Sequence, residues 1–131
     1  MVIFVDTSAI YALGNDADSN HRQAMTSLAA ALEAGEELLT HNYVLLESAV
    51  LLHRRLGWTA TERFLREAAM FQVHWIQDVM HRAAADQFVR RRGRVSLVDE
   101  VSFLVMRERG ISEALAFDQD FLREGFRYYR T

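Results

Sequence analysis

The stretch Val2-Ile3-Phe4-Val5-Asp6 near the start of the chain is a continuous apolar run that ends on an acid. Apolar residues of this kind, β-branched or aromatic and without polar alternation, are typical of a strand buried on both faces of a parallel sheet. In such sheets, ligands bind beyond the carboxyl ends of the strands. Asp6 is therefore predicted to lie at a reactive position, although an ordinary turn residue is an equally good interpretation of this aspartate alone.

The rest of the chain alternates between helical patterns and short apolar runs. Apolar spacing and capping signals predict helices at 9–13, 21–33, 43–56, from 59 or 61 to 69, 78–92 and 96–109. Apolar runs predict strands at 38–40, 71–76, 114–117 and 126–129, with a turn at 118–124. The predicted N-caps are Asn42, Asp78 and Ser96, and the predicted helix ends are Gly35, Gly57 and Gly110.

This order predicts an α/β fold, in which helices pack on a mainly parallel sheet with the last strand at an edge. The chain contains no proline and no Gly- or Ser-rich linker, so we expect one domain over residues 1–131. Half of the residues are hydrophobic, which is ordinary for a globular protein. No apolar run approaches the roughly 20 residues that a membrane span needs, and the N-terminus does not resemble a signal peptide.

The composition removes several classes of chemistry. The chain has no cysteine, which excludes disulfides and thiolate catalysis and suits a cytoplasmic location. All 15 basic residues are arginine. A P-loop and Schiff-base catalysis both require a lysine, so neither can operate here in its usual form. The net charge of −3 argues against a general nucleic-acid coat but not against an enzyme that meets phosphates through metal ions.

Three further acids, like Asp6, stand at positions where a functional role is possible. Asp118 follows the predicted strand 114–117, and a turn is again the alternative. Glu47 has only apolar neighbours at helical spacing, so its carboxylate carries a desolvation cost unless a cation or hydrogen bonds offset it. Asp99 fits both a capping box with Ser96 and a metal ligand at a helix start, and the two roles are compatible.

Together these acids predict a site for a hard cation. Mg²⁺ or Mn²⁺ prefers a few carboxylates together with water and phosphate oxygens. Several carboxylates from separate elements are tolerable in one pocket only if a cation neutralises them. The matching reaction is the hydrolysis of a phosphodiester bond.

The ordered set of acidic motifs resembles the PIN-domain ribonucleases, especially the VapC toxins of bacterial toxin–antitoxin pairs. The motifs that carry this resemblance are Val5-Asp6-Thr7-Ser8-Ala9, Glu47 in a helix, Ser96-Leu97-Val98-Asp99 and Ala116-Phe117-Asp118-Gln119-Asp120-Phe121. The resemblance implies a PIN-like three-layer fold with a five-stranded sheet between helices. It also implies that Asp6, Glu47, Asp99 and Asp118 are the catalytic residues and hold Mg²⁺ or Mn²⁺. Thr7 or Ser8 would orient Asp6 or a water, and Asp120 could assist or replace Asp118.

On this basis we expect a metal-dependent endoribonuclease, the toxin of a toxin–antitoxin pair. The alternatives are a stand-alone RNA-processing PIN nuclease and a catalytically inactive PIN-like binding module. The expected partners are an RNA substrate, a separate antitoxin and a second copy of the chain in a homodimer. The chain also has a basic run, which consists of Arg90, Arg91, Arg92 and Arg94. Its side chains could contact RNA phosphates, or they could simply interact favourably with the helix dipole at the C-terminus of a helix.

Overall fold

A single parallel sheet runs through the centre of the computed structural model, which describes residues 1–130. Its strands are β1 (Val2–Val5), β2 (Glu37–His41), β3 (Gln72–His74), β4 (Glu113–Leu115) and β5 (Arg127–Tyr128). Their order in the sheet is β3-β2-β1-β4-β5, and every neighbouring pair is parallel. The predicted α/β fold is confirmed, as is the placement of the last strand at an edge.

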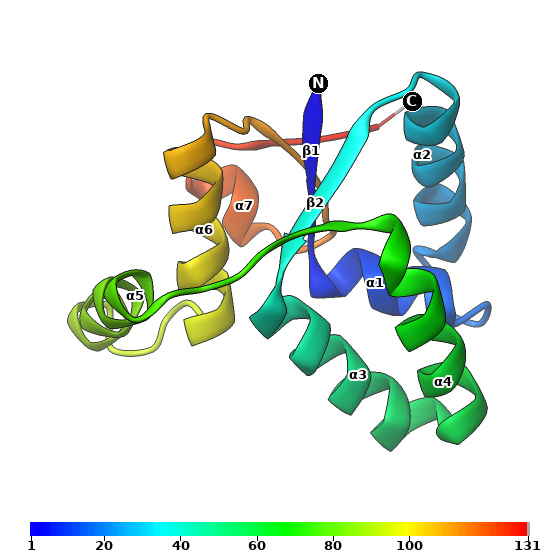
Figure 1. The fold of residues 1–131 in the computed structure, drawn as a ribbon, viewed down its shortest axis with the longest axis horizontal. Helices are drawn as coiled ribbons and strands as arrows, with labels where there is room; N and C mark the ends of the chain where they lie inside the picture. Colours follow the sequence, from blue (N-terminus) through cyan, green and yellow to red (C-terminus); the bar gives the residue numbers. More distant parts are fainter. Residues whose placement is uncertain (131) are drawn as a thin grey trace.

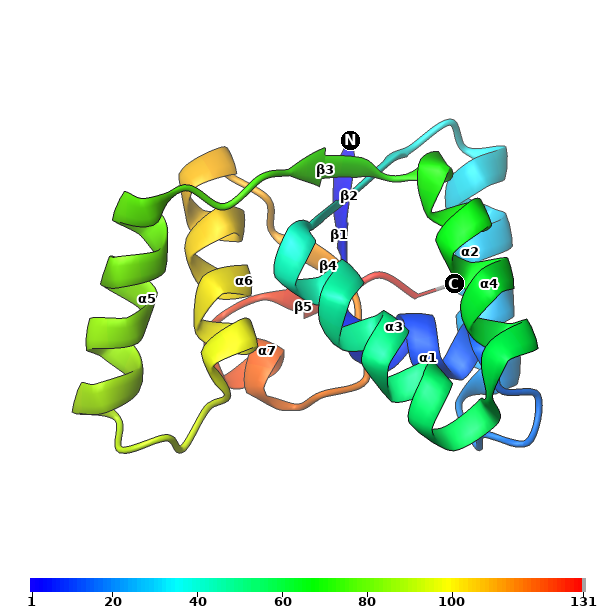
Figure 2. The same ribbon diagram turned by 60° about the horizontal axis from the view of Figure 1, so that its bottom comes forward.

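Helices cover the sheet from both sides (Figures 1 and 2). One group lies on one side of β1 and contains α1 (Thr7–Gly14), α2 (His21–Glu33), α3 (Asn42–Leu56) and α4 (Trp58–Glu67). The other group contains α5 (Asp78–Arg90), α6 (Leu97–Arg109) and the short α7 (Asp120–Arg123), and α5 packs on the outside of α6. A 3-10 turn, η1 (Ala68–Met70), follows α4. This is the predicted three-layer arrangement. Within residues 1–130, no helix combines the length and the apolar character needed to cross a membrane.

The central strand explains why the apolar run at the start of the chain decides the fold. β1 pairs with β2 on one side and with β4 on the other, so both of its edges are hydrogen-bonded. Ile3, Phe4 and Val5 are completely buried. The Phe4 ring lies 6.1 Å from that of Phe121, and Phe121 in turn packs edge-on against Phe103 at 5.0 Å. Aromatic packing of this kind ties the sheet to α6 and α7.

Several helix starts differ from the sequence prediction. Asn42 was predicted as an N-cap but is the first residue of α3, and the ring of His41 accepts the capping bond from the Val44 amide instead. The Asn42 side chain accepts a hydrogen bond of 2.7 Å from the Ile76 amide, which fixes α3 to the segment after β3. Asp78 likewise is the first residue of α5, not its cap. α4 begins at Trp58, directly after Gly57, and not at a threonine.

The C-terminal strands are shorter than predicted, and a helix replaces the predicted turn. β4 ends at Leu115, because the Phe117 amide donates to the Ser8 hydroxyl at 2.9 Å and not to a neighbouring strand. The Asp118 carboxylate accepts a bond from the Asp120 amide at 2.9 Å, and α7 begins there. The prediction for α6 is confirmed at both ends, since Ser96 accepts from the Asp99 amide and Gly110 takes a left-handed conformation.

A partly buried ion-pair network connects the end of α5 to α6 and α7. The Arg91 guanidinium donates two hydrogen bonds to the Glu124 carboxylate, at 2.7 and 2.9 Å. Arg91 Nε also lies 3.4 Å from the buried Glu100, and Arg107 pairs with Glu124 at 2.8 Å. The hydrogen bonds from Arg91 are the main reason that the pKa of Glu124 falls to about 2.

Replacing Glu124 with glutamine should therefore destabilise the fold. We expect Glu124→Gln to lower the free energy of unfolding at pH 7 by about 1.5–3 kcal/mol, the usual contribution of hydrogen bonds to charged groups. Because the pKa of Glu124 is lowered on folding, this contribution is present above the unfolded pKa and is lost as the pH falls towards 2. Urea unfolding of both proteins at pH 7 and pH 3 measures the difference.

Glu113→Gln is the matched control, because Glu113 pairs with the exposed Arg127 at 3.3 Å. Exposed pairs of this kind contribute at most about 1 kcal/mol. If the two variants lose the same free energy of unfolding, the Arg91–Glu124 contact stabilises the fold no more than an exposed ion pair does.

Candidate active site

Acidic side chains from separate elements meet at the carboxyl end of the central strands. Asp6 follows β1, Asp118 follows the neighbouring strand β4, and Asp99 lies in the first turn of α6. Carboxylate oxygens of Asp99, Asp118 and Asp120 all lie within 4.8 Å of one another. The parallel sheet thus brings together residues that are more than 100 positions apart in the sequence.

The pKa values of Asp6 and Asp99 are raised, because both side chains are buried and lie near other carboxylates. Burial, together with smaller contributions from the negative charges of Asp6, Asp118 and Glu47, raises the pKa of Asp99 to about 9. Burial also raises the pKa of Asp6 to about 6, with a smaller contribution from Asp118. Only 3% of Asp6 and 8% of Asp99 is exposed to solvent. Asp6, Asp99 and Asp118 thus lie near one another at the carboxyl end of the sheet, and Glu47, half-buried on α3, is near enough for its charge to act on Asp99.

Ser8 fixes the orientation of Asp6. Its hydroxyl donates to Asp6 Oδ2 at 2.6 Å, and its backbone amide donates to the same oxygen at 3.1 Å. The Ser8 hydroxyl also accepts the bond from the Phe117 amide, so it links the ends of β1 and β4. Thr7 Oγ1 is buried and has no hydrogen-bond partner among the described residues. Of the two hydroxyl side chains proposed to orient Asp6, that of Ser8 is the one that hydrogen-bonds to it.

Asp120 belongs to the acid cluster together with Asp118. Its carboxylate also accepts a hydrogen bond of 2.8 Å from Arg123 on the outer side of α7. Sequence alone left Asp118 and Asp120 as alternatives, since two acids separated by one residue fit the same motif. In the structure the backbone turns between them, so both carboxylates approach Asp99.

The donor set fits a divalent cation. Asp6 Oδ1 is buried and has no hydrogen-bond partner within residues 1–130, although its partner oxygen Oδ2 has two. A buried carboxylate oxygen without a partner is costly, and crowded carboxylates repel one another. A hard cation such as Mg²⁺ or Mn²⁺ would satisfy Asp6 Oδ1 and neutralise the cluster.

An arginine–aromatic stack that was not predicted from the sequence lies beside this cluster. The Arg130 guanidinium lies between the rings of Phe117, at 4.5 Å, and Tyr128, at 4.4 Å, and donates to the Ala116 carbonyl. The Tyr128 hydroxyl is buried without a hydrogen-bond partner among the described residues, and burial raises its pKa, with smaller contributions that include Asp118 and Asp6. No local pattern signals this arrangement, because it depends on the pairing of β5 with β4.

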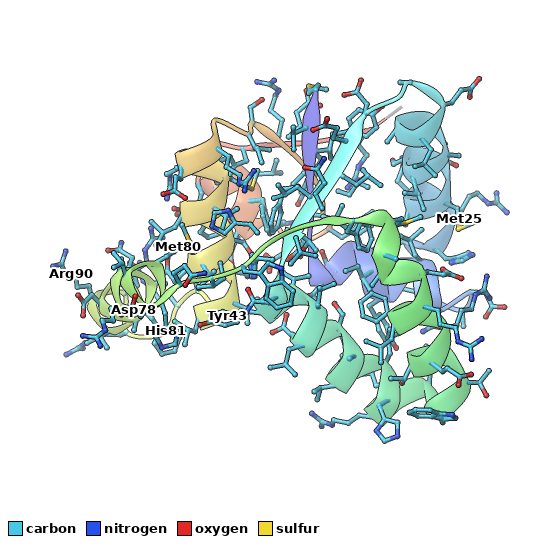
Figure 3. The ribbon with its side chains drawn as sticks, viewed as in Figure 1. Met25, Tyr43, Asp78, Met80, His81 and Arg90 are labelled. Carbon is cyan, nitrogen blue, oxygen red and sulfur yellow. The ribbon has the colours of Figure 1, made fainter. Side chains whose placement is uncertain are left out.

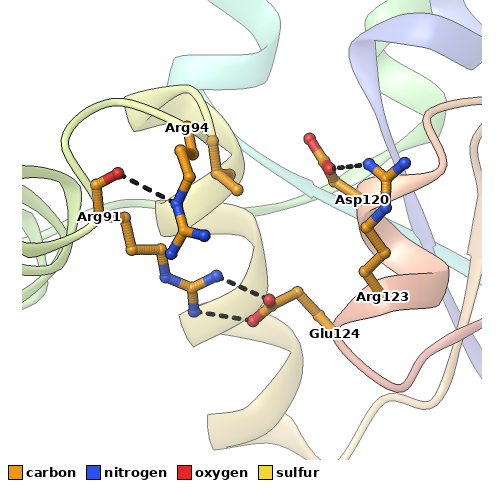
Figure 4. Close-up of a pocket in the computed structure, with 6 residues that line it drawn as sticks. Arg91, Arg94, Asp120, Arg123 and Glu124 are labelled. Atoms are coloured by element: carbon orange, nitrogen blue, oxygen red, sulfur yellow. Dashed lines mark hydrogen bonds and ion pairs between the residues drawn. The ribbon is translucent and has the colours of Figure 1, made fainter.

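The arginines of the predicted basic run have different surroundings. Arg90 lies on the outer side of α5 (Figure 3), and Arg92 is exposed with a positive φ of 55°. Arg91 is held by Glu124 (Figure 4). Arg94 is exposed and borders a pocket next to Asp120. The run is thus not a uniform basic face.

Comparison with known proteins defines the class of this fold and site. The model of the PIN domain matches residues 3–126, nearly the whole chain. The chain therefore belongs to the PIN-domain family.

Within the family, the chain is similar to the 23S rRNA-specific endonuclease VapC20 of Mycobacterium tuberculosis, with 38% identity over 128 residues and 95% of both chains covered. The crystal structure of that protein, described as a sarcin-ricin loop cleaving toxin, superposes with a TM-score of 0.81 over 95% of both chains. PAE2754 from Pyrobaculum aerophilum has a TM-score of 0.62 at 20% identity, with 98% of this chain and 92% of that chain covered, and supports the fold alone.

Proposed function

We propose that the chain is a metal-dependent endoribonuclease of the VapC toxin type. The observation that carries the proposal is the acid cluster at the carboxyl end of β1 and β4, with its buried and unpartnered Asp6 Oδ1. The similarity to VapC20 over 95% of both chains supports RNA as the substrate.

In this proposal Asp6, Glu47, Asp99 and Asp118 are the catalytic residues and hold Mg²⁺ or Mn²⁺, with Asp120 as a further oxygen donor. The cation supplies Lewis-acid stabilisation and makes water a better nucleophile at neutral pH. Ser8 keeps Asp6 in one orientation through two bonds to Oδ2, which leaves Oδ1 directed to the cation. Asp99, whose pKa is near 9 in the cluster, must lose its proton for the site to bind a cation, so binding is expected to weaken at low pH.

The substrate that we propose is the sarcin-ricin loop of 23S rRNA, because VapC20 is described as cleaving that loop. Incubating the purified protein with ribosomes and with naked 23S rRNA, followed by primer extension, tests the proposal. We expect a single strong cut in the loop. Cuts scattered through the rRNA, with none favoured in the loop, would still agree with an endoribonuclease. They would contradict the proposal that the sarcin-ricin loop is its substrate.

We propose that the protein forms a homodimer in the cytoplasm and is inhibited by a separate antitoxin. Large apolar side chains on two helices remain about half exposed or more, namely Met25 and Leu32 on α2 and Leu46 and Val50 on α3. Such uncovered apolar surface is typical of protein interfaces. Light scattering of the purified chain and growth inhibition on expression test this proposal. A strict monomer that does not affect growth would contradict it and favour an RNA-processing nuclease.

A further inference from the structure

A pocket of about 580 Å³ lies beside the acid cluster, between the loop that joins α5 to α6 and the short helix α7 (Figure 4). It is lined by Arg91, Arg94, Val95, Asp120, Arg123 and Glu124. Its wall includes Asp120, whose carboxylate also belongs to the acid cluster. The pocket therefore opens next to the place where the cleaved phosphodiester would lie.

We infer that this pocket is a subsite for an RNA backbone phosphate next to the cleaved bond, with Arg94 and Arg123 as its contacts. The inference rests on the proposed ribonuclease function and adds the residues that position the strand. Arg94 belongs to the basic run that the sequence offered as possible phosphate contacts, whereas Arg123 was not among the candidates.

The three arginines of the pocket are not equivalent. The two terminal nitrogens of Arg91 are both bonded to Glu124, and its Nε faces the buried Glu100. Arg91 therefore holds the pocket wall in place, and its charge is already paired with two carboxylates. Arg94 donates only through Nε, to the Arg91 carbonyl at 3.3 Å, and forms no ion pair with any residue in the 1–130 range. The Arg94 side chain is exposed, and its terminal nitrogens have no hydrogen-bond partner among residues 1–130, so they can bind an anion.

Arg123 is the second proposed contact, and its present partner, Asp120, also belongs to the acid cluster. Its Nη1 lies 2.8 Å from Asp120 Oδ1, and 68% of its side chain is exposed. The same Asp120 carboxylate lies within reach of Asp99 and Asp118. Arg123 uses Nη1 for this pair and Nη2 for a 3.4 Å contact with Gln119, so further N–H groups of its exposed guanidinium can bind a phosphate with or without a metal ion.

The charge of the pocket agrees with an anionic ligand. Three arginines face two acids, Asp120 and Glu124, which leaves one positive charge in a protein whose net charge is −3. A guanidinium matches the geometry of phosphate oxygens, so an arginine pair is well suited to hold a nucleic-acid backbone.

The test is RNA binding without cleavage. A labelled single-stranded RNA containing the sarcin-ricin loop sequence is titrated with protein in EDTA at several NaCl concentrations. The variants are Arg94→Gln, Arg123→Gln and the double variant. Arg63→Gln is the matched control, because Arg63 is equally exposed and pairs with Glu67 at 2.7 Å on α4, away from the pocket.

We expect Arg94→Gln and Arg123→Gln each to weaken binding about tenfold, as for the loss of one charge-assisted hydrogen bond. The slope of log Kd against log salt should fall by about 0.7 for each lost phosphate contact to a single strand. Arg63→Gln should keep the affinity and slope of the parent. Melting temperatures should stay unchanged in all variants, because these side chains are exposed.

Two different failures can be told apart. If the parent cleaves RNA in Mn²⁺ but the pocket variants bind RNA with the parent's affinity and salt slope, the subsite is wrong and the proposed function stands. If the parent neither binds nor cleaves RNA, the proposed function fails and the subsite fails with it.

Discussion

Asp6→Asn, Glu47→Gln, Asp99→Asn and Asp118→Asn should each slow RNA cleavage by about a hundredfold to a thousandfold. The four acids act as one unit, so the loss of one charge disturbs the position of the cation for all of them. Asp6, Asp118 and Glu47 lie close enough to Asp99 for their negative charges to raise its pKa. Single-turnover cleavage of a labelled RNA at saturating Mn²⁺ measures the loss without interference from product release.

Asp78→Asn is the control for this series. It removes the same charge from the exposed first residue of α5 and should retain nearly the full cleavage rate. If Asp99→Asn cleaves RNA at the parent rate, Asp99 does not belong to the catalytic unit. If Asp78→Asn is as impaired as the others, the losses reflect a general effect of charge and not the cluster.

The same cluster should make the metal-free protein less stable as the pH rises. The pKa of Asp99 is raised from 3.8 to about 9, so the folded state holds a proton that the unfolded state releases between these values. Stability is therefore lost as the pH increases through this window. In EDTA at pH 8, Asp99→Asn should melt about 5 °C above the parent, which corresponds to roughly 1 kcal/mol in a domain of this size.

Addition of Mg²⁺ should reverse this order. Binding to the folded state alone stabilises the parent by mass action, whereas the variant should respond much less. A purely capping role for Asp99 predicts the opposite, a loss of about 0.3–1 kcal/mol with or without metal. A variant that melts below the parent in EDTA and responds fully to Mg²⁺ would place Asp99 at the helix end only.

The parts of the fold that sequence predicted are those with local signals. The limits of α2 and the Ser96 and Gly110 ends of α6 follow from apolar spacing and capping chemistry within a few residues. The limits of β4 and the existence of α7 did not follow, because they depend on the bond from the Phe117 amide to Ser8, 109 positions away. Asn42 was misplaced for a similar reason, since its partner Ile76 lies on a distant segment.

The candidate site divides in the same way between local and distant signals. The nearness of Asp6, Asp99 and Asp118 could be predicted, because each acid stands at the end of a strand or the start of a helix and a parallel sheet brings strand ends together. The approach of both Asp118 and Asp120 to Asp99 could not be predicted, nor could the different contacts of the arginines. Arg91 and Arg94 look alike in sequence, and only the distant Glu124 distinguishes the paired Arg91 from Arg94, which forms no ion pair among residues 1–130.

The central claim is that this acid cluster cuts RNA with a bound divalent cation. Its most direct test is cleavage of one labelled RNA by the purified parent after removal of metal with EDTA and after restoration of excess Mn²⁺ or Mg²⁺. We expect no cleavage in EDTA and full recovery of the parent when at least one of the two ions is restored. Asp99→Asn should stay inactive under all these conditions. Cleavage that continues at the same rate in EDTA, in the parent and in Asp99→Asn alike, would contradict it.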